Sequence, residues 1–74
     1  MTWNIRVVKY TEEGKPVLAL AEVFYNTHGK PCGFTSASAE EESIDDLHQY
    51  VDWMKEALAL PILEFDKDFG NWNK

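Results

Sequence analysis

Residues 3–25 read W-N-I-R-V-V-K-Y-T-E-E-G-K-P-V-L-A-L-A-E-V-F-Y, and this stretch decides the fold. Apolar and polar residues alternate at the start of residues 3–10, where β-branched and aromatic types predominate, which predicts a strand. Residues 11–16 contain a glycine and a proline and are typical of a turn. A second strand is predicted at residues 17–25. It is apolar on both faces except at Glu22, so we expect its first half to be central and covered.

A third, shorter strand is predicted at residues 32–36, which contain Phe34. The connection before it, residues 26–30, places Gly29 where a tight turn commonly requires positive φ. Two consecutive short connections favour neighbouring antiparallel strands, so the simplest sheet is a three-stranded antiparallel meander.

A helix is predicted to begin at Ser43, whose side chain can cap the first turn, with Asp45 and Asp46 at the positive end of the helix dipole. Apolar residues then recur at three- and four-residue spacing and form one stripe, namely Ile44, Leu47, Val51, Met54 and Leu58. Pro61 disfavours helical geometry in the residue before it, so the helix should end near Ala59.

The C-terminal tail has two parts. Leu63 and Phe65 alternate with charged residues like a short edge strand, whereas residues 70–74 are expected to fray. The predicted fold is one small α+β domain spanning residues 1–74. It has a three-stranded antiparallel β-meander with one α-helix packed on one face, in the order β-β-β-α, and a short C-terminal edge strand.

The charge of the chain is unevenly distributed. The formal net charge is −6, but residues 1–39 carry +1 and residues 40–68 carry −8. The second segment contains an acidic strip, defined as Glu40, Glu41, Glu42, Asp45, Asp46, Asp52, Glu64, Asp66 and Asp68. Such a surface repels phosphate backbones, so we expect no direct binding of nucleic acid. Two explanations of the strip remain open: a solvated surface that keeps the protein soluble, or a functional mimic of nucleic acid.

The sequence predicts a cytoplasmic protein with no membrane contact. The longest apolar run, residues 16–21, is far shorter than the ~20 residues of a membrane span. The N-terminus lacks the basic and apolar regions of a secretory signal. Cys32 is the single cysteine, so it has no intramolecular disulfide partner, which suits a reducing compartment.

Two groups of side chains, mostly acidic, are candidates for a metal site. One group shares a face of the predicted helix: Asp45, His48 and Asp52. The other would point the same way in an extended strand: Glu64, Asp66 and Asp68. Zinc prefers several His or Cys ligands, so ordinary helix-surface polarity explains the first group better. No EF-hand loop is present, and a charged sheet edge that blocks aggregation explains the second group equally well.

The pair His28 and Cys32 lacks the third, orienting group that an activated thiol needs. We expect Cys32 to be a small buried hydrophobe at the start of a strand. No phosphate loop, nucleophile elbow or dinucleotide fingerprint is present in the sequence. We therefore predict no catalytic residue, no metal site and no cofactor, and a protein that is not an enzyme.

Ten aromatic residues are more than a thin two-layer core can hold. We expect four in the core: Trp3, Phe24, Phe34 and Trp53. The others are candidates for a partner-binding surface: Tyr10, Tyr25, Tyr50, Phe65, Phe69 and Trp72. Either the tail folds back over the open sheet face, or a protein partner or second copy covers that face. We favour the partner, because three strands and one helix leave one face uncovered.

An ordered series of short segments spans most of the chain: W-N-I-R-V-V from residue 3, E-V-F-Y from 22, G-K-P from 29, G-F-T from 33, M-K-E-A-L from 54 and P-I-L from 61. The series resembles a family of short uncharacterised bacterial and phage proteins that open W-N-Y-R-V and continue with E-V-Y-Y, G-K-P, G-W-T and M-L-E-A-L. It departs from that pattern at Ile5, His28 and Phe34. The resemblance implies a bacterial or phage setting and no particular chemistry. The order of strands and helix is also loosely similar to HicB-type antitoxins.

Together these observations predict a small acidic cytoplasmic protein-interaction or regulatory module that binds a protein partner or a second copy of itself. The first alternative is a phage- or antitoxin-type inhibitor that blocks a basic, nucleic-acid-binding cleft by acidic mimicry. The second alternative is a minor metal-binding or enzymatic role for His48 and neighbouring acids.

Overall fold

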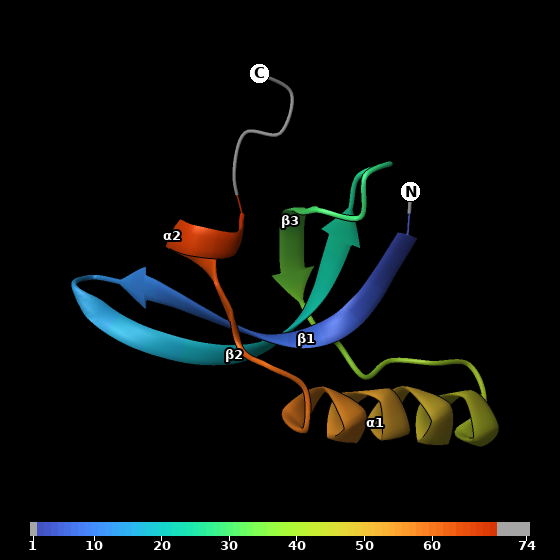
Figure 1. Ribbon diagram of the computed structural model, residues 1–74. Helices are drawn as coiled ribbons and strands as arrows, with labels where there is room; N and C mark the ends of the chain where they lie inside the picture. The colour runs from blue at the N-terminus through green and yellow to red at the C-terminus, as the bar shows by residue number, and fades with distance from the viewer. Residues whose placement is uncertain (1, 70–74) are drawn as a thin grey trace.

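The computed structural model describes residues 2–69 and contains one sheet and two helices (Figure 1). Its elements are β1 (Thr2–Glu12), β2 (Lys15–Tyr25), β3 (Pro31–Ser36), α1 (Ile44–Leu58), β4 (Leu63–Glu64) and α2 (Phe65–Asp68). The strand order is β3-β2-β1-β4. The predicted α+β class, with a helix packed on a sheet, is confirmed. The expected fraying of residues 70–74, and Trp72, lie outside the described residues.

The β1–β2 hairpin is longer than the sequence predicts. Each strand has 11 residues, and they pair antiparallel from Thr2 opposite Tyr25 to Glu12 opposite Lys15. The two-residue turn between them, formed by Glu13 and Gly14, has φ of 51° and 80°. Positive φ at both central residues matches the right-handed twist of the strands, so the pairing extends up to the turn.

The first half of β2 is not covered as expected. β3 pairs only with Ala21–Tyr25, so among the described strands the preceding part of β2 pairs with β1 alone. Leu18 is 61% exposed as a result. The sequence prediction is wrong here because β3 is too short to extend along the whole hairpin.

Two clusters of buried residues lie on opposite faces of the sheet, because successive strand residues point to opposite sides. The cluster on the face covered by α1, the helix-side face, contains Ile5, Tyr50 and Ala57, packed against Leu20, Ala37 and Met54. The cluster on the opposite face, the far face, contains Val8, Ala21 and Val23, packed against Tyr10, Tyr25, Phe34, Leu63 and Phe69. The core is therefore divided between two thin layers.

Helix α1 begins as predicted, with the Ser43 Oγ accepting a hydrogen bond from the Asp46 N–H at 3.1 Å. Its buried face differs from the predicted stripe. Tyr50 and Ala57 are buried, whereas Ile44 and Leu58 are 67% and 68% exposed. The apolar arc of the helix is wider than the strip that contacts the sheet, so its flanks remain exposed.

The tail crosses to the other side of the sheet. β4 pairs parallel to β1, with Leu63 opposite Val8, so the sheet is mixed. The predicted edge strand is confirmed for these two residues and is wrong beyond them, because Phe65–Asp68 form the single turn of α2. In Figure 1, α2 lies above the sheet and α1 below it.

One half-buried side chain, that of Arg6, holds this crossing. Arg6 Nη2 donates a 2.6 Å hydrogen bond to the Pro61 carbonyl, which lies between α1 and β4. We expect Arg6→Met to lower the free energy of unfolding by about 1–2 kcal/mol, because it removes a charged donor from that carbonyl. Urea denaturation would measure the loss, with the exposed Lys9→Met as the control. Equal stability of both variants would contradict a role for this hydrogen bond.

Candidate interaction surfaces

Large apolar side chains are exposed around α1. Six of them line two hollows on its flanks: Trp3, Trp53 and Leu60 in one, and Leu18, Leu58 and Ile62 in the other. We call these the edge groove and the hairpin hollow. Ile44, at the start of α1, is also exposed. Grouped exposed apolar side chains mark interaction sites more often than isolated ones do.

The edge groove has a volume of about 300 Å³ and lies between β1 and the second half of α1. It is lined by Trp3, Asn4, Ile5, Trp53, Glu56, Ala57 and Leu60. The rings of Trp3 and Trp53 meet edge to face, with centroids 6.0 Å apart and an interplanar angle of 88°. This edge-to-face arrangement is one that aromatic pairs prefer, and it forms an aromatic wall of the groove.

Three consecutive residues of β1 line this groove, namely Trp3, Asn4 and Ile5. Adjacent strand residues point to opposite faces, so a hollow that contacts all three lies at the edge of the strand. Within residues 2–69, the strand that pairs with β1 on this side is β4, and it reaches only Val8 and Lys9. The N-terminal half of β1 is therefore an open sheet edge beside an apolar groove.

The hairpin hollow has a volume of about 240 Å³ and is lined by Val7, Leu18, Ala19, Leu20, Leu58 and Ile62. Residues of the β1–β2 hairpin and of the C-terminal end of α1 both line this hollow, and the hairpin continues past that end of the helix (Figure 1). The helix ends at Leu58 and the chain turns toward β4, so the hairpin is left with a partly uncovered apolar face.

The prediction that Trp3 and Trp53 are core residues is wrong. They are 46% and 41% exposed, whereas Phe24 and Phe34 are half-buried. Trp3 lies on the open edge strand and Trp53 on the flank of α1, so each ring packs on one side only. Sequence pattern alone does not reveal this, because exposure depends on which strand is at the edge.

The aromatic residues of the far face pack on one another. Phe34 is the centre of this cluster, with ring centroids 5.8 Å from Tyr10, 5.7 Å from Phe65 and 5.4 Å from Phe69. Phe65 and Phe69 also lie 5.7 Å apart. The tail thus folds back over the far face as far as residue 69. The sequence favoured a partner over this arrangement of the tail. Phe65 remains 46% exposed.

Two tyrosines from the candidate partner-binding set make internal hydrogen bonds. Tyr25 is half-buried, and its hydroxyl donates to Asn4 Oδ1 at 2.6 Å. Tyr50 is only 4% exposed, so its ring belongs to the core and is not part of an exposed surface. Its hydroxyl donates to Glu22 Oε2 at 2.8 Å and accepts from the Ser38 N–H at 2.9 Å.

The environment of Tyr50 also changes its acidity. Burial raises the pKa of its hydroxyl above the usual value of 10.0, and the hydrogen bond that it donates to Glu22 raises it further. The neutral hydroxyl is thereby kept as a donor to a carboxylate at the helix–sheet boundary. The sequence does not reveal this hydrogen bond, because Tyr50 and Glu22 are 28 positions apart. Glu22 is visible there only as a lone polar residue in an apolar strand.

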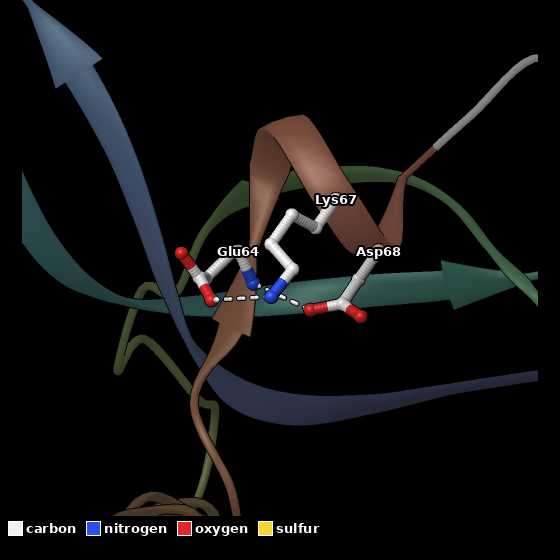
Figure 2. Close-up of polar contacts among 3 residues, drawn as sticks. All are labelled: Glu64, Lys67 and Asp68. Atoms are coloured by element: carbon white, nitrogen blue, oxygen red, sulfur yellow. Dashed lines mark hydrogen bonds and ion pairs between the residues drawn. The ribbon is translucent and has the colours of Figure 1, made fainter.

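The acidic strip separates into two parts. All of its members from residue 40 to 52 are exposed, and Glu40, Glu41, Glu42 and Asp46 line an open depression of about 480 Å³ before and at the start of α1. In the tail, Asp68 Oδ2 accepts a hydrogen bond from the Glu64 N–H at 2.7 Å, and Lys67 Nζ lies 3.7 Å from Glu64 Oε2 (Figure 2).

In the tail, the side chains of Glu64 and Asp68 therefore interact with groups within residues 64–68. Asp68 caps the turn that Glu64 begins, and the predicted common direction of Glu64, Asp66 and Asp68 is wrong because α2 replaces the extended strand. Within residues 2–69, no group of three His, Cys, Asp or Glu side chains is placed to hold a metal ion. The helical trio of Asp45, His48 and Asp52 is fully on the exposed side of α1.

Cys32 is exposed, contrary to the expected burial. Its Sγ lies 3.4 Å from the Phe24 carbonyl, to which it can donate a weak hydrogen bond. His28 belongs to the turn before β3, which is organised by Asn26. The Asn26 side chain accepts hydrogen bonds from the N–H groups of His28 and Lys30 at 2.9 and 3.0 Å. This geometry explains His28 as a turn residue.

No helix among residues 2–69 is long and apolar enough to cross a membrane. Comparison of the chain with protein-family models, curated proteins and solved structures found no match.

Proposed function

We propose that the protein is a small interaction module that binds another protein through the apolar surface around α1. The observation that carries this proposal is the pair of hollows beside α1, lined by six exposed large apolar side chains. Tryptophans that become buried at the centre of an interface contribute a large share of the binding free energy. Trp3 and Trp53 are suited to this role, since each ring packs on one side and has an exposed side that a partner could bury.

The proposed setting is the reducing cytoplasm of a bacterium, or of a host cell during phage infection. The single exposed thiol of Cys32 supports a reducing compartment. The resemblance to short bacterial and phage proteins supports a bacterial cell as the setting.

Affinity capture from the host cell, followed by binding measurements with the recovered partner, tests this proposal. We expect the double variant Leu18→Ser/Trp53→Ser to weaken partner binding at least tenfold, because it makes both hollows polar. Phe65→Ser is the matched control, since Phe65 is similarly exposed on the far face. Sedimentation velocity would show whether the partner is a second copy. A monomer that captures no partner, or one whose capture is unaffected by the double variant, would contradict the proposal.

A second candidate is acidic mimicry of nucleic acid, which the open depression formed by Glu40, Glu41, Glu42 and Asp46 favours. Clustered exposed carboxylates attract a basic cleft, and salt weakens this attraction. We expect the protein to compete with DNA for a basic nuclease and the triple variant E40Q/E41Q/E42Q to lose this competition. Competition that survives the triple variant would eliminate the candidate.

A further inference from the structure

We infer that the edge groove binds an extended, basic and apolar peptide segment of another protein as an added strand on the open edge of β1. This inference rests on the proposed interaction function and names its site and the chemistry of its partner. It is carried by three features of the groove: a strand edge that no other strand pairs with among residues 2–69, an aromatic pocket beside that edge, and a one-sided acidic rim.

The first feature is the unpaired edge. Alternate residues of an edge strand direct their N–H and C=O groups away from the sheet, where an incoming peptide can pair with them. Edge strands are commonly protected by proline, lysine or very short length. β3, at the other edge of the sheet, is short and begins with Pro31. The open half of β1 has neither protection, and its one cation, Arg6, is bonded to Pro61.

The second feature is the pocket. Side chains of an added strand alternate between the two faces of the sheet, so every second one would enter the groove on the helix side. There it would meet Trp3, Trp53 and Leu60, all three of which are more than 40% exposed. An apolar side chain would remove this surface from water. The groove therefore selects a strand with an apolar residue at alternate positions.

The third feature is the charge of the rim. Residues three, four or seven positions from Trp53 share its flank of α1. On this flank lie Glu56, which lines the groove, together with Gln49 and Asp46. The nearest cation in the helix sequence, Lys55, is two positions from Trp53 and so points to another side. Lysine or arginine residues on the peptide would complement this rim.

The same rim argues against a second copy of this chain as the occupant. Antiparallel pairing of two β1 edges would place both α1 helices on one side of the joined sheet. Their flanks carrying Asp46 and Glu56 would then face each other, and like charges in close proximity disfavour association. A basic segment from a different protein avoids this repulsion.

The experiment begins with selection from a displayed library of random 12-residue peptides, using the full chain as bait. We expect enriched peptides to be basic, to alternate apolar residues and to lack proline. For a synthetic peptide of the consensus sequence, Trp53→Ala should raise Kd at least tenfold and Glu56→Gln about threefold. Phe65→Ala, which alters an exposed ring on the far face and neither hollow, is the control and should leave Kd within twofold.

N-methylation of the peptide backbone distinguishes strand addition from other binding modes. One alternating set of peptide amides would face β1 and the other set would face solvent. We expect methylation of one set to abolish binding and methylation of the other to leave Kd within threefold. Circular dichroism of each protein variant would verify that it remains folded. Equal effects of the two methylated sets would overturn strand addition.

Other outcomes also overturn the inference. An acidic consensus, an absence of enriched peptides, or a dimer that Trp53→Ala dissociates would each do so. Tighter peptide binding by Trp72→Ala would identify the C-terminal segment of the chain as the occupant instead. Partner capture that depends on Leu18 but not on Trp53 would reject the edge groove and retain the proposed interaction function. Partner capture that depends on neither Leu18 nor Trp53 would reject both the edge groove and the proposed interaction function.

Discussion

Replacing Tyr50 with alanine is expected to lower the free energy of unfolding by about 3–5 kcal/mol, enough to unfold much of a domain this small. Tyr50 is 4% exposed and lies in the helix-side cluster with Ile5 and Ala57. Its removal leaves a cavity between α1 and the sheet and also deprives Glu22 of its hydroxyl donor. Urea denaturation followed by tryptophan fluorescence would measure the loss.

Tyr50→Phe separates the hydroxyl from the ring. This variant keeps the packing but leaves Glu22 Oε2 and the Ser38 N–H without the partner they share, so we expect a loss of about 1–3 kcal/mol. Tyr25→Phe is the matched control, because the Tyr25 hydroxyl also donates to a side chain but at an exposed position. It should cost less than about 1 kcal/mol. Equal losses in the two variants would show that burial of the Tyr50 hydroxyl has no special effect.

The pH dependence of stability gives a second readout of Tyr50. Its pKa is higher in the folded protein than in the unfolded chain, so the folded state holds the phenolic proton more tightly. The resulting stability is fully present below the unfolded value near pH 10 and is lost as pH rises through the folded pKa. Unfolding free energy measured from pH 8 to 11 should therefore fall less steeply in Tyr50→Phe. Identical slopes would contradict this linkage.

Replacing Phe34 with alanine is expected to lower the unfolding free energy by about 2–4 kcal/mol and to release the tail from the far face. The Phe34 ring contacts Tyr10, Phe65 and Phe69 and is the link between β3 and α2. Without it, the single turn of α2 loses most of its aromatic packing. Hydrogen exchange would detect the release as faster exchange of amides in residues 63–69.

Phe65→Ala is the matched control for Phe34. Phe65 belongs to the same cluster but is 46% exposed, so less surface returns to water and we expect a loss of about 1 kcal/mol. A Phe34→Ala variant with unchanged exchange in residues 63–69 would contradict the role of the aromatic cluster in holding α2.

The elements with local signals could be predicted from the sequence. Alternation and β-branched residues indicated the strands, the turn residues indicated the hairpin, and Ser43 marked the start of α1. These features depend on neighbours along the chain, since a cap or a turn is stabilised within a few residues. The α+β class followed, because three strands and one amphipathic helix have few ways to bury their apolar faces.

The candidate site could not be predicted in the same way. The apolar arc of α1 offers several faces to the sheet, and the sequence stripe favoured Ile44 and Leu58, whereas Tyr50 and Ala57 are buried. The direction of the tail was equally undecided, because residues 63–68 alternate like a strand but close into a turn capped by Asp68. Both outcomes depend on contacts with residues distant in sequence.

The amino-acid sequence by itself determined the hairpin, the helix and its cap, and the concentration of negative charge in residues 40–68. Only the tertiary structure decided that Tyr50 is buried, that Trp3 and Trp53 are exposed, and that no strand within residues 2–69 pairs with the outer edge of the N-terminal half of β1. The physical reason is that local pattern determines backbone conformation, whereas exposure depends on which elements lie beside one another. In a sheet whose outer strands are short, that depends on where β3 and β4 end.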